Sequence, residues 1–157
     1  MLVYRLSKEK CKEDLSGDGA SYGVNHRWNT KGTNLLYTSS SRALACLEVA
    51  VHIPLGLLPK SGDYHMMSID IPDNIKIFEP PLNLLPTAWN SRPVRPESQD
   101  FGDQFVAKCK FAILKVPSIV VAGDYNYLIN PKHYDFKEIK PTLTEPFPFD
   151  PRLLGLK

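Results

Sequence analysis

The sequence predicts an α+β domain with a mostly antiparallel sheet and short helices. Short runs of aliphatic and aromatic residues have the composition of strands, and prolines or glycines separate them. The segments with helical periodicity do not alternate regularly with these runs, as they would in βαβ units. The chain has 157 residues, which suits a single domain over 1–157 that buries its core without disulfides or metals.

Several stretches have the residue types of strands. They are residues 2–6, 35–38, 64–71, 75–78, 111–116, 119–122, 127–129 and 136–139. Pro117 and Ser118 break the most strand-like part of the chain, and a residue at such a break can point into a cleft. Repeated prolines exclude long regular structure over 80–96, and the apolar residues of 147–154 are expected to dock on the sheet.

The strongest helical pattern covers residues 42–53. Leu44 and Leu47 recur there at helical spacing, the serines just before offer N-cap oxygens, and Pro54 marks the end. A second helix is expected over 100–110, where apolar residues recur at i, i+4 and i+8.

Residues 8–26 are polar and rich in glycine. A short helix followed by a loop is expected here, with a turn at Gly17-Asp18-Gly19. The loop lacks the spacing of a dinucleotide-binding fingerprint, so we expect it to form a flexible wall over a cleft.

The charge and the cysteines exclude several classes of function. The 19 basic and 17 acidic residues leave a net charge of +2. The sequence has no basic run with interleaved aromatic residues, so direct binding of nucleic acid is not expected. Cys11, Cys46 and Cys109 form no C-x-x-C pair, so neither a zinc site nor a disulfide framework is indicated. No charged-then-apolar leader and no apolar run of about 18 residues is present, which predicts a cytoplasmic protein without membrane contact.

Glu48 is the anomaly of the sequence. At the helical angle it lies on the same side as Leu44 and Val51, so its carboxylate points toward the apolar face. One interpretation is a residue at the edge of the stripe whose flexible stem reaches water. The other is a carboxylate at the wall of a cleft, since an arginine, a tryptophan, a tyrosine and a histidine lie close by in the chain and together suit an anionic ligand with rings.

Motifs that follow one another along the chain resemble those of the RES-domain family. They are Val3-Tyr4-Arg5, Arg27-Trp28-Asn29 followed by Gly32, Tyr37-Thr38-Ser39, Leu47-Glu48-Val49 with His52, Val116-Pro117-Ser118, Asn126 through Asn130-Pro131, and Phe149-Asp150 with Arg152. The resemblance covers essentially the whole chain, although Val24-Asn25-His26 stands where the family often carries a glycine pair. The family is named for an arginine, a glutamate and a serine. Its members are typically toxins whose partner is an Xre-like antitoxin.

The resemblance implies the split-sheet fold of ADP-ribosyltransferases, with NAD bound in a cleft between the sheet halves. It implies three catalytic residues, Glu48, Arg27 and Tyr37. It also implies a set of NAD-binding residues, namely Arg5, Arg27, Tyr37, His52 and Ser118. The two arginines would neutralise the pyrophosphate, Tyr37 would stack on nicotinamide, and the histidine and serine would position the ribose or the carboxylate.

Each of these roles has a simpler alternative. Arg5 can be an edge-strand arginine that reaches water, and Tyr37 an ordinary core tyrosine. Ser118 can be a turn hydroxyl that bonds the local backbone, and His52 has no role that spacing alone defines.

The function implied by the resemblance is that of a toxin that cleaves the nicotinamide–ribose bond of NAD, with NAD as substrate and with no cofactor or metal. Water as acceptor would make it a glycohydrolase, phosphate a phosphorylase, and a protein side chain a mono-ADP-ribosyltransferase. A ribonuclease toxin and a non-catalytic module that only binds a partner are the rival interpretations.

Overall fold

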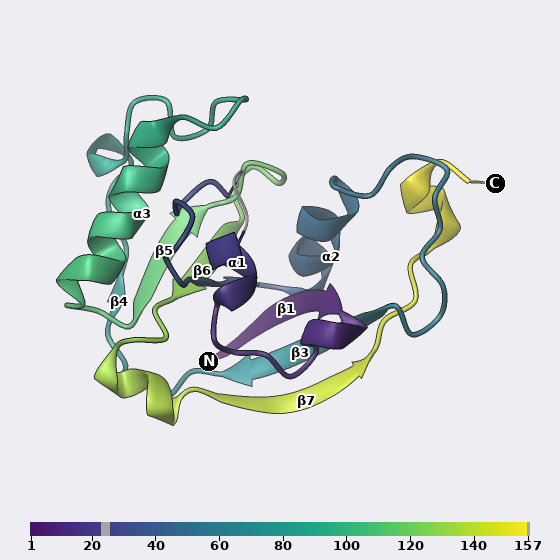
Figure 1. Ribbon diagram of the computed structural model, residues 1–157, viewed down its shortest axis with the longest axis horizontal. Coiled ribbons are helices and arrows are strands. Elements are labelled where there is room, and N and C mark those ends of the chain that lie inside the picture. Colours follow the sequence, from purple (N-terminus) through teal and green to yellow (C-terminus); the bar gives the residue numbers. More distant parts are fainter. Residues whose placement is uncertain (23–25, 157) are drawn as a thin grey trace.

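The computed structural model describes residues 1–22 and 26–156 (Figure 1). The strands are β1 (Leu2–Lys8), β2 (Leu36–Ser39), β3 (Tyr64–Asp70), β4 (Ile77–Phe78), β5 (Ile113–Pro117), β6 (Tyr125–Ile129) and β7 (Lys140–Pro146). The α-helices are α1 (Asp18–Tyr22), α2 (Arg42–Ala50) and α3 (Pro96–Lys108), and 3-10 turns lie at Glu9–Cys11, Leu82–Leu84, Tyr134–Glu138 and Pro151–Leu154. The expected loop at Gly23 to Asn25 lies outside the described residues.

The seven strands form one sheet in the order β4-β5-β6-β2-β1-β3-β7. All neighbours are antiparallel except β4 and β5. β1 pairs with β3 along its whole length, whereas it meets β2 at the pair Tyr4 and Ser39. The sheet therefore divides into a β2 half (β4, β5, β6, β2) and a β1 half (β1, β3, β7). This confirms the predicted α+β class and its mostly antiparallel, split sheet.

Different helices cover the two halves, with α3 beside β5, α2 beside β1 and α1 between them (Figure 1). One buried cluster joins α3 to the β2 half through Trp28, Leu35, Leu85, Phe105, Val106, Leu114, Val116 and Leu128. Another joins α2 and the C-terminal segment to the β1 half through Leu6, Ala45, Cys46, Ala50, Met66, Phe149 and Leu154. The expected docking of 147–154 is thus confirmed.

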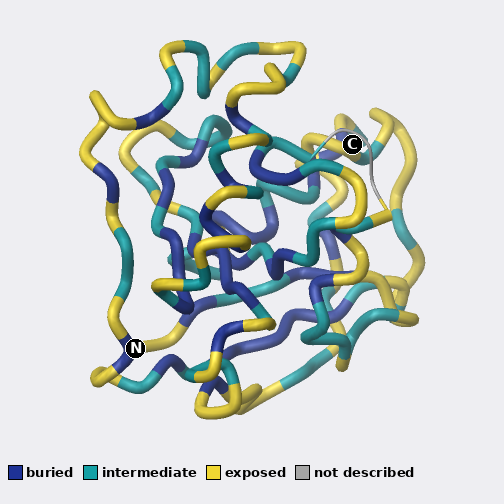
Figure 2. Tube along the Cα trace, turned by 60° about the vertical axis from the view of Figure 1, so that its left-hand side comes forward, coloured by how far each residue is buried: buried dark blue, intermediate teal, exposed yellow. Residues whose placement is uncertain are grey.

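A third cluster contains residues of both halves and joins them. It includes Val3, Leu36, Met67, Ile69, Ile71, Ile75, Ala112, Ile113, Tyr127, Ile129 and Ile139. The buried stretches run through the middle of the molecule and the exposed stretches lie in peripheral loops (Figure 2). Apolar burial of this kind is the main favourable term in folding, so the halves are held together from one side while the cleft described below opens between the other two clusters.

Helix α2 begins and ends close to the predicted residues. Ser41 is its N-cap, and the hydroxyl oxygen of Ser41 accepts a hydrogen bond from the Leu44 N–H at 3.0 Å. The helix stops at Ala50, before Pro54. Helix α3 begins earlier than predicted, because Pro96 occupies its first turn, where a missing N–H costs nothing.

Three sequence predictions were wrong. Residues 119–122 are a turn, because β5 and β6 pair up to Pro117 and Tyr125 and the chain must reverse in the interval. Residues 136–139 belong largely to the 3-10 turn that ends at Glu138, and the strand begins only at Lys140. The expected turn at 17–19 instead begins α1, with Gly17 in a left-handed conformation (φ 72°) just before it.

Candidate active site

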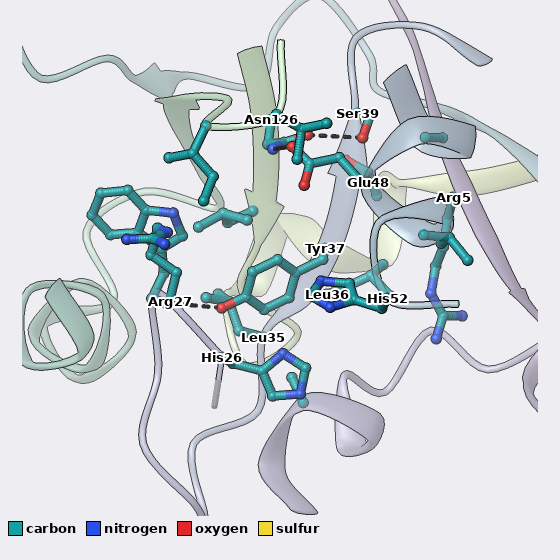
Figure 3. Close-up of a pocket in the computed structure, with 18 of the residues that line it drawn as sticks. Arg5, His26, Arg27, Leu35, Leu36, Tyr37, Ser39, Glu48, His52 and Asn126 are labelled. Atoms are coloured by element: carbon teal, nitrogen blue, oxygen red, sulfur yellow. Dashed lines mark hydrogen bonds between the residues drawn. The ribbon is translucent and has the colours of Figure 1, made fainter. Parts of the chain in front are cut away.

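A cleft of about 690 Å³ lies where the two halves of the sheet meet. Its apolar walls include Trp28 and Leu128 from one cluster and Leu6 and Ala45 from the other. The predicted site residues that line it are Arg5, Arg27, Tyr37, Glu48 and His52 (Figure 3). Helix α1 also lines the cleft through Gly19 and Ala20, so part of the wall that was expected to be a flexible loop is helical. A cavity of this size, with apolar walls and several charged and polar side chains that point into one space, is typical of a small-molecule site.

The Glu48 carboxylate is held from two sides through one of its oxygens. Ser118 Oγ donates a hydrogen bond to Glu48 Oε1 at 2.8 Å, and Asn126 Nδ2 donates to the same oxygen at 2.6 Å. Glu48 Oε2 has no partner among the described residues, and the side chain lies between Asn126 and Tyr37 in Figure 3. The carboxylate is therefore fixed in orientation with one oxygen available to a ligand.

Ser118 supports Glu48 and at the same time shapes its own turn. The hydroxyl oxygen accepts hydrogen bonds from the N–H groups of Val120 and Val121 at 3.0 and 3.1 Å. Ser118 is only 4% exposed and lines a smaller neighbouring cavity instead of the main cleft. The Ser118 hydroxyl thus bonds both the local backbone of its turn and a residue of the cleft. Its contact with NAD stays a prediction.

Tyr37 presents its ring, and not its hydroxyl, to the cleft. The hydroxyl donates to Asn29 Oδ1 at 2.7 Å and accepts from the Trp28 N–H at 3.1 Å. Burial raises the pKa of Tyr37 far above its ordinary value. The phenol is therefore unsuited to acid–base chemistry, whereas the ring face, with the His26 ring 5.4 Å away, suits stacking on a flat heterocycle.

Helix α3 holds the segment that carries Arg27, residues 26–30, in place. Gln99 Nε2 donates to the His26 carbonyl at 2.9 Å, and Asp103 Oδ1 accepts from the Thr30 N–H at 3.0 Å. The segment has no regular secondary structure, so these bonds replace the missing ladder partners of its backbone.

The Arg27 guanidinium is anchored on the loop before α3. Its Nη1 donates to the carbonyls of Trp89 and Ser91, and Nη2 also donates to Ser91. Burial and the neighbouring positive charge of Arg92 lower the pKa of Arg27. The Nε hydrogen and one Nη2 hydrogen have no partner among the described residues. This edge can bind two oxygens of an anion side by side.

Arg5 lies apart from Arg27. Its Nη1 donates to the carbonyls of Cys11 and Asp14, and burial lowers its pKa. The two guanidinium groups lie on opposite sides of the Tyr37 ring in Figure 3, so the structure does not bring them together on one anion. The arginine beside Arg27 is Arg92, which also lines the cleft and was missed by the sequence analysis.

The histidines lie beside the Tyr37 ring. His52 follows the C-cap of α2 and is exposed, and His26, which the sequence analysis did not select, is half-buried. Burial lowers the pKa of His26, and the charge of His52 lowers it further. Both imidazoles line the cleft next to the ring that we expect to stack on a ligand (Figure 3).

Asn126 and Ser39 also line the cleft, and no role was predicted for them from the sequence. Two signals were available: both residues belong to the motifs that resemble the family, and Asn126 is a polar amide inside the strand β6. Within residues 1–22 and 26–156, no helix is long and apolar enough to cross a membrane. Over the same part of the chain, no group of three or more histidine, cysteine or acidic side chains has metal-binding geometry.

The fold and the site define a small split-sheet protein in which an arginine and a clamped glutamate face one cleft. Residues 2–150 match the RES domain. The chain belongs to the RES-domain family of toxins. It is 39% identical over 146 residues to a Sphingobium protein named Prs ADP-ribosylating toxin, covering 90% of this chain and 88% of that protein. It is 34% identical over 157 residues to Toxin Res of Yersinia enterocolitica, covering 98% and 99%.

A solved structure shares the fold. It is the crystal structure of the M. tuberculosis MbcT-MbcA toxin-antitoxin complex, which aligns with a TM-score of 0.71 over 98% of this chain and 86% of that chain. The sequence identity in this alignment is 17%, so the likeness concerns the fold alone.

Proposed function

We propose that this toxin cleaves the bond between nicotinamide and ribose in NAD and transfers the ADP-ribosyl group to an acceptor. The observation that carries the proposal is the Glu48 carboxylate, fixed through Oε1 by Ser118 and Asn126 and open to the cleft through Oε2. A fixed negative charge beside an aromatic ring and an arginine edge matches the charges of NAD at its reacting bond.

The chemistry follows from where charge develops. Nicotinamide leaves with the electron pair of the C–N bond and becomes neutral, and the ribose carbon becomes an oxocarbenium-like centre. Glu48 stabilises this positive charge, and Tyr37 stacks on the departing ring. The acceptor then supplies an electron pair to the ribose carbon and releases its proton. Arg27 holds a phosphate group through its free edge, so the dinucleotide stays in place during the reaction.

The acceptor distinguishes two candidate reactions. A protein acceptor, which gives mono-ADP-ribosylation, is favoured by the printed name of the Sphingobium relative, which describes that protein as ADP-ribosylating. Water or phosphate as acceptor would give an NAD glycohydrolase or phosphorylase from the same bond cleavage. The products of the reaction distinguish these acceptors.

The test uses the purified chain and NAD labelled in the adenosine part. Release of nicotinamide measures bond cleavage, chromatography separates free ADP-ribose from its phosphate ester, and labelled protein bands reveal transfer when cell extract is added. Total RNA is incubated in parallel. Intact NAD under all conditions would contradict the proposal, and degraded RNA would instead support a ribonuclease.

Arg27→Lys is expected to weaken NAD binding by about 10-fold or more and to slow turnover as well. A lysine keeps one positive charge but cannot keep both the loop carbonyls and the free two-donor edge. Titration with NAD and steady-state kinetics measure the two effects separately. Arg152→Lys is the matched control, because Arg152 is exposed and pairs with Asp150 outside the cleft. Unchanged affinity in folded Arg27→Lys would make Arg27 a structural residue.

We further propose an antitoxin of the Xre-like class as partner, acting by covering the cleft. Arg27 and Arg92 make this part of the cleft positive, so an acidic side chain or a chain terminus is the simplest blocking group. Co-purification with the product of the neighbouring gene is expected to lower NAD turnover at least about 10-fold, since a blocking group competes directly with substrate phosphates. A stable complex with full activity would contradict cleft occlusion.

A further inference from the structure

We propose that Asn126 is a positioning residue that fixes the active rotamer of Glu48, and that Ser39 sets the orientation of the Asn126 amide. The inference rests on the proposed NAD cleavage and adds two residues to its machinery. Neither side chain is expected to contact the reacting atoms. Both act through the carboxylate of Glu48.

The hydrogen bonds form a chain with one consistent direction (Figure 3). Ser39 Oγ donates to Asn126 Oδ1 at 2.8 Å, and Asn126 Nδ2 donates to Glu48 Oε1 at 2.6 Å. A flipped amide would place its carbonyl oxygen against an ionised carboxylate, which has no hydrogen to donate. The Ser39 hydroxyl stabilises the correct orientation of the Asn126 amide, because it donates a hydrogen bond to the amide oxygen.

The two residues lie on the rigid part of the fold. Ser39 and Asn126 are directly opposite each other across β2 and β6, and Asn126 is also opposite Val116 of β5. Glu48, by contrast, comes from helix α2 and has a flexible side chain. The sheet thus supplies a fixed reference for a carboxylate that its own helix cannot orient.

The role of Asn126 differs from that of Ser118. Ser118 belongs to the turn after β5, so it approaches Glu48 Oε1 from a loop, whereas Asn126 approaches from the strand. With Asn126 removed, Ser118 alone would hold the carboxylate and leave it free to rotate about one hydrogen bond. Catalysis would suffer, while the groups expected to bind NAD, Arg27 and Tyr37, would stay in place.

Asn126→Ala is therefore expected to lower kcat by roughly 10- to 100-fold, the worth of one charge-assisted hydrogen bond, with KM for NAD changed by less than about threefold. Ser39→Ala is expected to give a smaller fall, because the amide remains but is no longer oriented. Thr142→Val is the control, since it removes a cross-strand hydrogen bond to Ser68 in the β1 half, away from the cleft, and should leave kcat unchanged.

Asn126→Asp tests the positioning role through the pH dependence of kcat, which would not change if Asn126 were only a structural residue. The two carboxylates would share one proton, and the singly protonated pair would still donate a hydrogen bond to Glu48. Its kcat relative to wild type is therefore expected to fall as the pH rises through the upper pKa of the pair. The other charged or titratable residues that line the cleft are Arg5, Arg27, Arg92, Tyr4, Tyr37, His26 and His52. Both proteins share them, so their own titration enters both terms of the ratio.

The variants are measured with circular dichroism to confirm folding and with Glu48→Gln in parallel. Inactive Glu48→Gln together with wild-type kcat in folded Asn126→Ala, or a flat pH ratio for Asn126→Asp, would overturn the positioning role alone. If Asn126→Ala does not fold, Asn126→Asp and Ser39→Ala decide the point. Full activity in Glu48→Gln would overturn the proposed function itself, so the two failures are distinguishable.

Discussion

Glu48→Gln is expected to abolish most NAD cleavage, with a fall in kcat of at least about 100-fold and an unchanged fold. Glutamine has nearly the same shape as glutamate. Its amide oxygen can still accept the hydrogen bonds from Ser118 and Asn126, with the amide nitrogen directed to the cleft. The variant therefore keeps the local structure and removes only the negative charge, which is the feature that the proposed transition state requires.

The measurement is nicotinamide release under saturating NAD, with affinity for NAD determined separately by titration. In the proposed mechanism Glu48 stabilises charge that develops only as the bond breaks, so the loss should appear in kcat more than in the dissociation constant. Near-normal turnover in a folded Glu48→Gln protein would refute the role of the carboxylate. Arg42→Lys serves as a comparison on the same helix, because Arg42 pairs with Glu145 and does not line the cleft.

Gly102→Ala is expected to destabilise the protein by about 3 kcal/mol or more, because overpacking against immobile backbone is among the costliest single changes. A Cβ added to Gly102 would lie 1.7 Å from the Trp28 carbonyl oxygen and 2.7 Å from its carbonyl carbon. The contact is with backbone, so no side-chain rotation can relieve it. Helix α3 would have to move away from the segment that carries Arg27.

Urea unfolding measures the loss of stability. NAD titration of the remaining folded fraction should show weaker binding, because a change in the packing of α3 on Trp28 also displaces the neighbouring Arg27. The matched control is Gly19→Ala. Gly19 also lies in a helix, but an added Cβ there has nothing within 4 Å, so this variant should be neutral or gain about 0.5 kcal/mol. Equal stability of the two alanine variants would show that α3 does not clamp this segment.

Local sequence patterns determined much of this protein. The spacing of Leu44 and Leu47, with the serines before them, predicted α2, because helix formation and capping depend on neighbouring residues. Glu48 lies at the wall of a cleft, as one interpretation had it, although Val51, which was placed on the same apolar face, is 49% exposed. The motif containing Arg27 likewise predicted an arginine that lines the cleft. The mostly antiparallel sheet followed from short strands without regular crossover helices.

Apolar composition alone misled where the end of a strand depends on its partner. Residues 119–122 have the residue types of a strand, yet the pairing of Pro117 with Tyr125 makes them a turn. That turn is what brings the Ser118 hydroxyl to Glu48. A local pattern describes which conformation a segment favours, but strand register decides where the chain must reverse.

The sequence by itself determined the class of fold, the family and the main charged groups of the site. Only the tertiary structure decided how those groups are held. Ser39 and Asn126 are 87 residues apart in the chain, and Arg27 bonds carbonyls more than 60 residues away. Such contacts have no local signal, because they arise from pairing and packing between elements that are far apart in the chain. The orientation of Glu48, which the proposed chemistry needs, is therefore a property of the folded sheet.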